Sequence, residues 1–234
     1  MRLTARLRLR AAPRDEVAAA YASAGLPGRR TRWREASWCA VDLELTGLDP
    51  REHEIISFGA IPVEHGRVQL RRAVAGLVAP KGPISETSIR VHGIRAADLA
   101  RAAPLADALG PLLEAITGRI LVVHFAAVER AFLGSALRSQ GLRLRGAMID
   151  TRVLSRIWLH ERDGRTPGWL SLAEIAGELG LPAEREHDAL SDALTTAQVF
   201  IALATHLDSV RAETVGSLAR AGGRLEALRA YHPS

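Results

Sequence analysis

An apolar run that leads directly into two alternating acidic residues constrains this chain more than any other stretch. Residues 38–41 have the composition of a buried β-strand, and Asp42 and Glu44 follow at alternating positions. Because side chains alternate between the two faces of a strand, both carboxylates are expected on the same face. Such a pair is costly to desolvate unless a cation neutralises it. Turn residues 46–50 then end the strand beside the acids.

The composition is that of an ordinary globular protein. With 234 residues, of which 47% are hydrophobic and 24% charged, the chain is long enough for one large domain with a full core. Its single cysteine, Cys39, excludes a disulfide framework and a thiolate zinc site within one chain. No apolar stretch reaches the length of a membrane span. We therefore expect a cytoplasmic protein that makes no use of a membrane.

The positive charge is concentrated at the front of the chain. The formal net charge is +5, and residues 1–36 contain nine arginines against three acidic residues, so the remainder is nearly neutral. We expect residues 1–36 to be a basic N-terminal extension, partly helical, with a helix from Asp15 to Ala24. This extension either packs on the main domain or offers a basic arm to phosphates.

The remaining sequence predicts an antiparallel meander followed by alternating helices and strands. The meander comprises residues 38–45, 55–61 and 68–78. After a loop at His92-Gly93-Ile94, the pattern predicts helices at 104–116, 126–139, 151–160, 171–180, 188–207 and 211–230, and strands at 120–123 and 147–149. This order indicates an α/β fold with a mixed sheet, in which sites form at the carboxyl ends of strands.

Two later acidic residues are candidates to join the first pair. Glu129 falls near the start of the helix that follows the buried strand 120–123. Asp192 lies in the first turns of the long apolar helix, with Asp188 as its cap and His187 just before it. Taken singly, an acid at the start of a helix is more often a solvated residue favoured by the helix dipole.

Three motifs in this order give the chain a resemblance to the DEDDh 3′–5′ exonucleases. That group holds the epsilon proofreading subunit of bacterial replicative DNA polymerase, ribonuclease T and oligoribonuclease. The motifs occupy residues 42–48, 124–133 and 187–193. The resemblance covers about residues 37–207 and implies a ribonuclease H-like fold, a mixed five-stranded sheet flanked by helices. Residues 1–36 and the C-terminal helix or tail, 208–234, lie outside it.

The second motif departs from the family pattern at three positions. Phe125 stands where asparagine is usual, Val128 where phenylalanine is usual, and Glu129 where the acid is normally aspartate. Glu129 keeps the charge but adds a methylene group, so its carboxylate must retract or reach a metal through water.

The resemblance implies a two-metal hydrolysis of a terminal phosphodiester, with Mg²⁺ or Mn²⁺ as cofactors. The implied metal ligands are Asp42, Glu44, Glu129 and Asp192. His187 would be the general base, because imidazole exchanges a proton near neutral pH. The implied contacts to the terminal nucleotide come from Thr46, Gly47, Leu48, His92 and His124.

Three functions are compatible with these motifs. The favoured one is a 3′–5′ exonuclease of the proofreading or repair type, which releases nucleoside 5′-monophosphates from DNA ends. Single-stranded ends are the favoured substrate. The second is an exoribonuclease acting on RNA or short oligonucleotides, since nothing in the motifs separates the two sugars. The third is a catalytically weak nucleic-acid-binding or polymerase-associated module. The implied partners are nucleic acid with a free 3′ end and a DNA polymerase. The motifs do not determine the oligomeric state, and a homodimer is compatible with them.

Overall fold

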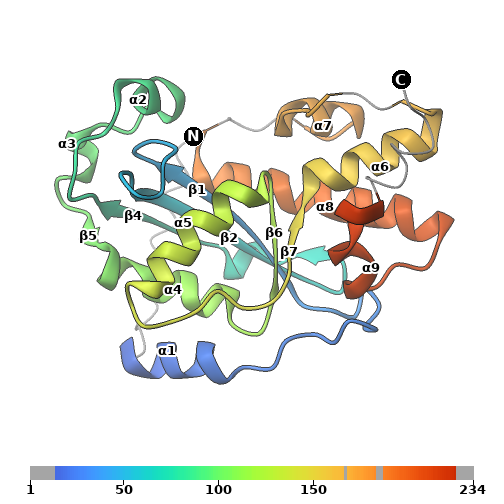
Figure 1. Cartoon of the computed structure of the whole chain (residues 1–234), viewed down its shortest axis with the longest axis horizontal. Coiled ribbons are helices and arrows are strands. Elements are labelled where there is room, and N and C mark those ends of the chain that lie inside the picture. Colours follow the sequence, from blue (N-terminus) through green and yellow to red (C-terminus); the bar gives the residue numbers. More distant parts are fainter. Residues whose placement is uncertain (1–13, 166–167, 183–186, 225–234) are drawn as a thin grey trace.

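The computed structural model describes residues 14–165, 168–182 and 187–224 and has a mixed β-sheet at its centre (Figure 1). The sheet order is β5-β4-β2-β1-β6-β7, and β3 pairs with β2. The strands are β1 (Trp38–Leu45), β2 (Ile55–Glu64), β3 (Arg67–Val68), β4 (Val74–Ala79), β5 (Ala103–Pro104), β6 (Ile120–Val123) and β7 (Met148–Asp150). Since β3 and β5 have only two residues each, the body of the sheet consists of the other strands. The predicted mixed α/β architecture is confirmed.

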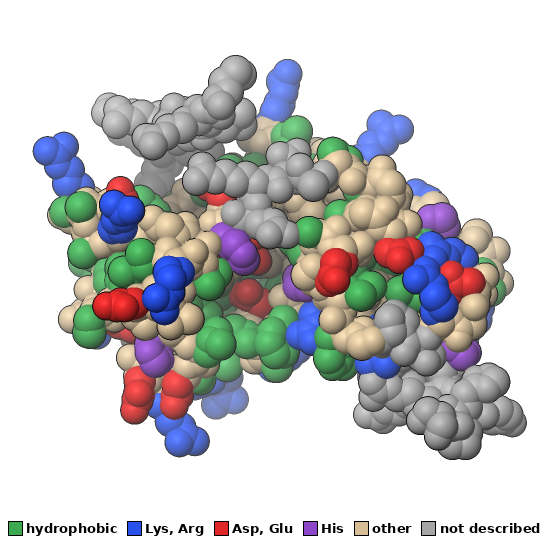
Figure 2. Space-filling view, turned by 90° about the horizontal axis from the view of Figure 1, so that it is seen from above, with side chains coloured by type: hydrophobic (Ala, Val, Ile, Leu, Met, Phe, Trp, Pro, Cys, Tyr) green, Lys and Arg blue, Asp and Glu red, His purple; other side chains and the backbone are tan. Residues whose placement is uncertain are grey.

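The pairing of the strands brings several chain ends to one edge of the sheet. β1 is antiparallel to β2 and parallel to β6, which is in turn parallel to β7. The carboxyl ends of β1, β6 and β7 therefore lie at the same edge. Figure 2 looks down on that edge and shows acidic side chains recessed in a hollow near its centre, beside a histidine.

Helices cover both faces of the sheet. One hydrophobic core packs β1 and β6 against α6 and α8, and the second packs them against α4, α5 and α1. The helices are α1 (Arg14–Ser23), α2 (Glu86–His92), α3 (Ala96–Leu99), α4 (Leu105–Ile116), α5 (Ala126–Arg138), α6 (Thr151–Asp163), α7 (Leu172–Glu178), α8 (Ala189–Val210) and α9 (Val215–Ala219). Within the described residues, none of these helices has the length and hydropathy needed to cross a membrane.

The side chains of β1 alternate between the two cores. Trp38 and Ala40 belong to the core beneath α8, whereas Cys39 and Val41 belong to the core beneath α4 and α5. Cys39 is a buried free thiol, and burial raises its pKa to about 12. By the same alternation, the two acids that end the strand continue the face that α8 covers.

The prediction of one strand over residues 68–78 is wrong. The chain leaves the sheet after β3, forms a 3-10 turn at Leu70–Arg72, and returns as β4. The backbone N–H of Gln69 donates to the carbonyl of Pro62 in β2. Proline has no backbone N–H, so Pro62 cannot donate a second hydrogen bond to Gln69. A proline in β2 thus interrupts the ladder at this point.

Two helical predictions also need correction. The final helix predicted over 211–230 begins only at Val215 and is interrupted at Arg220; residues 225–230 lie outside the described part of the chain. Helix α2 was not predicted, and His92 is its last residue rather than part of a loop. Ser85 caps its start, and Gly93 ends it with a left-handed φ of 72°.

Residues before the sheet contribute to the main core. Trp33 is fully buried, its ring lies edge-on to that of Phe200 at 6.1 Å, and its carbonyl accepts a hydrogen bond from the Trp38 indole at 2.8 Å. Helix α1 is held from the other side, where Arg145 donates to the carbonyls of Tyr21 and Ala24 at 2.7 Å each. The described part of the basic segment therefore packs on the domain. Residues 1–13 lie outside the described part.

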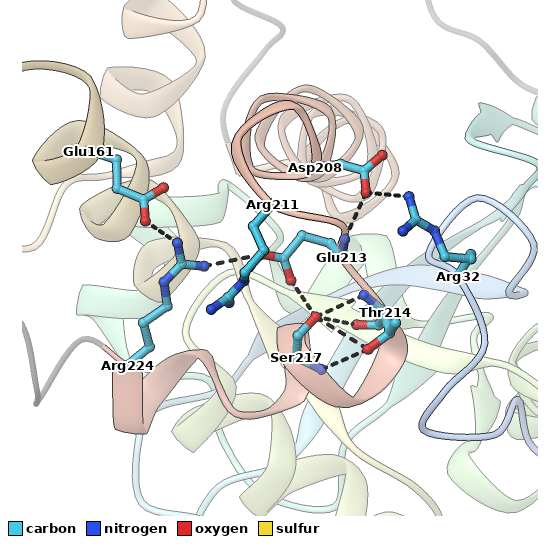
Figure 3. A network of polar contacts seen from close by, with 8 residues as sticks. All are labelled: Arg32, Glu161, Asp208, Arg211, Glu213, Thr214, Ser217 and Arg224. Carbon is cyan, nitrogen blue, oxygen red and sulfur yellow. Dashed lines mark hydrogen bonds and ion pairs between the residues drawn. The ribbon is translucent and has the colours of Figure 1, made fainter.

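The segment before β1 is joined to α8 and to the segment that follows it. Figure 3 shows that Arg32 pairs with Asp208 of α8 at 2.9 Å, and that Arg224 pairs with the buried Glu213 at 3.1 Å within the segment after α8. Residue 32 also forms a β-bridge with Thr214. A buried carboxylate needs such partners, because an unpaired charge in the interior is strongly destabilising.

We predict that Trp33→Ala lowers the free energy of unfolding by about 3–5 kcal/mol, because it empties a large site in the core. Trp169→Ala is the matched control, since that indole is half exposed, and we expect it to cost less than about 1 kcal/mol. Urea denaturation measures both. Equal urea midpoints for the two variants would show that Trp33 is not part of the core that unfolds cooperatively.

Candidate active site

Three carboxylates from two elements meet at the carboxyl edge of the sheet. Asp42 and Glu44 come from β1 and Asp192 from the first turns of α8, and one carboxylate oxygen of each lies within 4.8 Å of the others. Glu44 is buried, and the other two are partly exposed. Three of the four residues that the sequence predicted as metal ligands therefore lie together, because strand alternation puts Asp42 and Glu44 on one face and α8 adds Asp192.

Small residues let α8 approach the sheet closely enough for this meeting. Gly59 of β2 pairs with Asp42 in the sheet register. A Cβ at Gly59 would lie 2.1 Å from the carbonyl oxygen of Ala189. Ala189, Ala193 and Ala197 recur every four residues along the buried side of α8. Any larger side chain at this contact would push Asp192 away from the strand.

The electrostatics of the cluster are unfavourable without a cation. Burial raises the pKa of Asp42 well above its usual value, and the carboxylates of Glu129, Asp192 and Glu44 raise it further. Burial, with Asp192 and Asp188 adding to it, raises the pKa of Glu44 to about 7. Both shifts mean that the charged forms lack sufficient positive partners.

Glu129 reaches the cluster from the opposite face of the sheet. It lies in the first turn of α5, is 5% exposed, and accepts a hydrogen bond from the backbone N–H of Leu43. Its Oε2 atom is buried and has no hydrogen-bond partner among the described residues. Burial and the Glu44 charge raise its pKa, although the Leu43 bond opposes them. Glu129 is adjacent to the three grouped carboxylates but is not one of them.

The third motif is organised by the start of α8. Asp188 is the N-cap and accepts from the Ser191 amide at 3.0 Å. The backbone N–H of His187 donates to the Asp192 carboxylate at 2.8 Å, so the residue before the helix and the acid within it are fixed together. The His187 side chain is exposed and its φ is +63°, in the left-handed region.

The turn after β1 is pinned by its own hydrogen bonds. The Thr46 hydroxyl is buried and accepts from the Glu54 amide at 2.9 Å, while Thr46 N donates to the Glu54 carbonyl. A Cβ at Gly47 would meet the His53 ring at 2.2 Å, so the turn is tight there. The next side chain, Leu48, is 77% exposed. Of the three predicted nucleotide contacts in this turn, only Leu48 presents a free side chain.

The two remaining predicted contacts differ in their surroundings. His92 is half-buried, and its Nε2 lies 3.2 Å from the carbonyl oxygen of Leu45. Partial burial lowers its pKa, and the nearby His187 lowers it further. His124 lies on the far side of β1, with its Nδ1 3.0 Å from the Thr151 hydroxyl, and burial lowers its pKa to about 4. His124 is thus held as a neutral ring.

Sequence reasoning missed the residue that organises the edge beside His124. Asp150 ends β7 and caps α6; its carboxylate accepts from the amides of Ala126 and Arg152 at 2.9 Å and from that of Phe125 at 3.5 Å. It thereby joins the starts of α5 and α6. An aspartate directly before a helical pattern is a capping signal that could have identified it.

The arrangement fits a divalent cation. The donors are carboxylate oxygens, which suit Mg²⁺ or Mn²⁺ rather than a thiol-binding metal. One buried oxygen of Glu129 has no partner in the described part of the chain, and the pKa values of Asp42 and Glu44 are raised; a missing positive charge would produce both effects. The residues available to hold such ions are Asp42, Glu44, Asp192 and Glu129.

We predict that Gly59→Ala weakens cation binding without touching a carboxylate, because the new methyl group meets the backbone of α8. Stability should fall by about 1–3 kcal/mol, and the rise in melting temperature caused by Mn²⁺ should shrink. Gly110→Ala is the matched control, since a Cβ there meets no described atom within 4 Å. Equal Mn²⁺ responses in the two variants would contradict this role for Gly59.

Comparison with known proteins agrees with this geometry. The exonuclease family model RNase_T matches residues 39–200. The DNA polymerase III subunit epsilon of Aquifex aeolicus is 30% identical over 176 residues, covering 74% of this chain and 83% of that protein. A PolC-type DNA polymerase III of Thermotoga maritima is 33% identical over 168 residues, which are 71% of this chain. The chain spans only 12% of the length of that polymerase.

A solved structure shares the fold. The nuclease domain of 3′hExo, a DEDDh family member bound to rAMP, superposes with a TM-score of 0.60 at 18% identity, covering 76% of this chain and 94% of that one. At this identity the likeness shows the ribonuclease H-like fold alone. The family model, in contrast, matches most of the chain, and the DEDDh motifs fall within its range. The chain therefore belongs to the exonuclease family, with the fold and motif order of its DEDDh members.

Proposed function

We propose that this chain is a 3′–5′ exonuclease that hydrolyses the terminal phosphodiester of single-stranded DNA and releases nucleoside 5′-monophosphates. The observation that carries the proposal is the cluster of Asp42, Glu44 and Asp192 within 4.8 Å, with the buried Glu129 beside it. Such a concentration of carboxylates is unfavourable in a merely structural role.

In this proposal the four carboxylates bind two divalent cations. When bound there, Mg²⁺ or Mn²⁺ would supply a polarised water and would neutralise charge on the phosphate. Asp42, Glu44 and Asp192 would hold the ion that activates the water, and Asp42 and Glu129 would hold the other.

His187 is the proposed general base. Its side chain is exposed at the mouth of the site, while its backbone is tied to Asp192 at 2.8 Å. It would take the proton of the attacking water as the oxygen forms its bond to phosphorus. The P–O3′ bond then breaks, and the shortened strand leaves with its 3′ oxygen, which takes a proton from solvent water. Holding the base by its main chain leaves the imidazole able to turn toward solvent.

The terminal nucleotide is proposed to lie against Leu48 and His92. Leu48 is exposed in the turn that follows β1, and His92 contacts the carbonyl of Leu45, the last residue of β1. Gly47 allows close approach of its backbone, whereas the Thr46 hydroxyl is already engaged by the turn. His124, held neutral by burial against Thr151, contributes to the opposite wall.

DNA is the proposed substrate because the curated relatives described above are DNA polymerase III proteins. Action on RNA or short oligonucleotides is the second candidate, supported by the rAMP complex of the similar fold. We also propose a DNA polymerase as a partner and a cytoplasmic location, the latter in keeping with the lone buried Cys39. Size measurements in solution would establish whether the chain forms a homodimer.

Cation binding can be tested apart from activity. We predict that Mn²⁺ at a hundred times its dissociation constant stabilises the chain by about 2.7 kcal/mol, because it relieves repulsion among the carboxylates. Asp192→Asn should lose most of this gain. The exposed Asp107 of α4 provides the control substitution Asp107→Asn. A wild-type melting temperature that does not respond to Mn²⁺ would contradict the metal site.

Nucleotide release tests the activity. We expect 3′-labelled single-stranded DNA to release labelled nucleoside monophosphate with Mg²⁺ or Mn²⁺, and Asp42→Asn to lower kcat at least about a thousandfold. His187→Ala should lower it by about a hundredfold or more. RNA of the same sequence, assayed in parallel, shows whether the enzyme prefers deoxyribose or ribose substrates. If a folded wild-type chain that binds Mn²⁺ releases nothing from either polymer, it is a binding module instead.

A further inference from the structure

Two aromatic and two arginine side chains stack beside the carboxylate cluster. The guanidinium carbon of Arg152 lies 4.2 Å from the centre of the Phe125 ring and 4.6 Å from that of Trp169. The guanidinium of Arg156 also lies over Trp169, at 4.8 Å. We refer to Phe125, Arg152, Arg156 and Trp169 as the aromatic stack. Nothing in the proposed hydrolysis uses it.

Phe125 is held in an unfavourable backbone conformation. Its φ of +86° lies in the left-handed region, which is costly for a bulky residue. The Asp150 carboxylate holds the neighbouring amides of Ala126 and Arg152 in place. The ring nevertheless remains 45% exposed, and Trp169 is 50% exposed. Strain that leaves the Phe125 ring in solvent adds nothing to the packing of the core, so it points to a ligand.

The sheet order places this stack on the side of the carboxylates opposite to the terminal nucleotide. Leu48 follows β1 and His92 contacts its last residue, on the side toward β2 and β4. Phe125 follows β6, and Arg152 follows β7, on the other side of β1. In Figure 2, hydrophobic and basic side chains lie at one rim of the hollow that holds the acids. A strand whose last phosphodiester lies at the carboxylates can therefore reach the stack by leaving toward β6 and β7.

We propose that the aromatic stack binds the substrate strand just upstream of the scissile phosphodiester. An unpaired base would stack on the exposed rings of Phe125 and Trp169, and Arg152 would face its phosphate. Base–aromatic stacking is how single-stranded nucleic acids are held without sequence preference. No carboxylate among the described residues forms an ion pair with Arg152, whose contacts are with the two rings. This inference rests on the proposed function and names its second subsite.

Tryptophan fluorescence gives a direct test that does not depend on hydrolysis. Of the four tryptophans, Trp33, Trp38 and Trp158 are buried and Trp169 is exposed. With Ca²⁺ present to neutralise the carboxylates, titration with the pentanucleotide (dT)5 should quench the emission and saturate. Trp169→Phe should abolish the quenching while keeping an aromatic surface.

Affinity for labelled (dT)5, measured by fluorescence anisotropy, then separates stacking from a structural role. We expect Trp169→Ala to weaken binding about tenfold and Trp169→Phe to restore most of it. Val210→Ala is the control, because Val210 is 69% exposed but lies at the other end of α8, about 27 Å from Asp192 along the helix. Equal affinities for Trp169→Ala and the wild type would overturn the proposal.

A kinetic comparison distinguishes failure of this inference from failure of the proposed function. The p-nitrophenyl ester of thymidine 5′-monophosphate fills only the terminal subsite, whereas (dT)5 also reaches the stack. We expect the ratio of kcat/KM for (dT)5 over that for the ester to fall about tenfold in Trp169→Ala. Hydrolysis of neither substrate by the wild type would contradict the exonuclease, and an unchanged ratio would contradict the stack.

Discussion

Repulsion among carboxylates at the end of β1 is the constraint on which the rest of this structure depends. Asp42 and Glu44 stand on one face of a strand, and α8 brings Asp192 within 4.8 Å of them. Burial raises the pKa of both strand acids, so their charges oppose folding near neutral pH. The two hydrophobic cores must offset that cost. Because this cluster of negative charge lowers the stability of the fold, it indicates a site where a cationic ligand balances the charge.

Packing that brings these charges together is unusually close. Gly59 lies opposite Asp42 in the sheet and against the first turn of α8, where even a methyl group would meet the backbone of Ala189. The small side chains of α8 extend that contact along the sheet. Proximity of helix and strand, rather than any single polar bond, thus determines the distance between Asp42 and Asp192. The hydrogen bond from His187 N to Asp192 then fixes the carboxylate itself.

Local sequence patterns were sufficient to predict the strands and helices in which apolar residues recur at regular spacing. Alternation predicted the common face of Asp42 and Glu44, and apolar periodicity predicted α5 and α8. Features that depend on contacts between residues far apart in the sequence could not be predicted from these patterns. Pro62 interrupts the strand predicted over 68–78, because it lacks the N–H that the ladder needs. Likewise, the Thr46 hydroxyl is engaged by Glu54, eight residues away.

The departures from the family motif concentrate in the first turn of α5, where they act together. Glu129 lies one turn after Phe125, and its buried carboxylate faces the backbone N–H of Leu43 while one of its oxygens has no partner among the described residues. Phe125 turns outward in a left-handed conformation that the Asp150 hydrogen bonds hold. The same turn therefore supplies a carboxylate inward and an aromatic ring outward. Its strain is explained if the strand that reaches the carboxylates also passes over that ring.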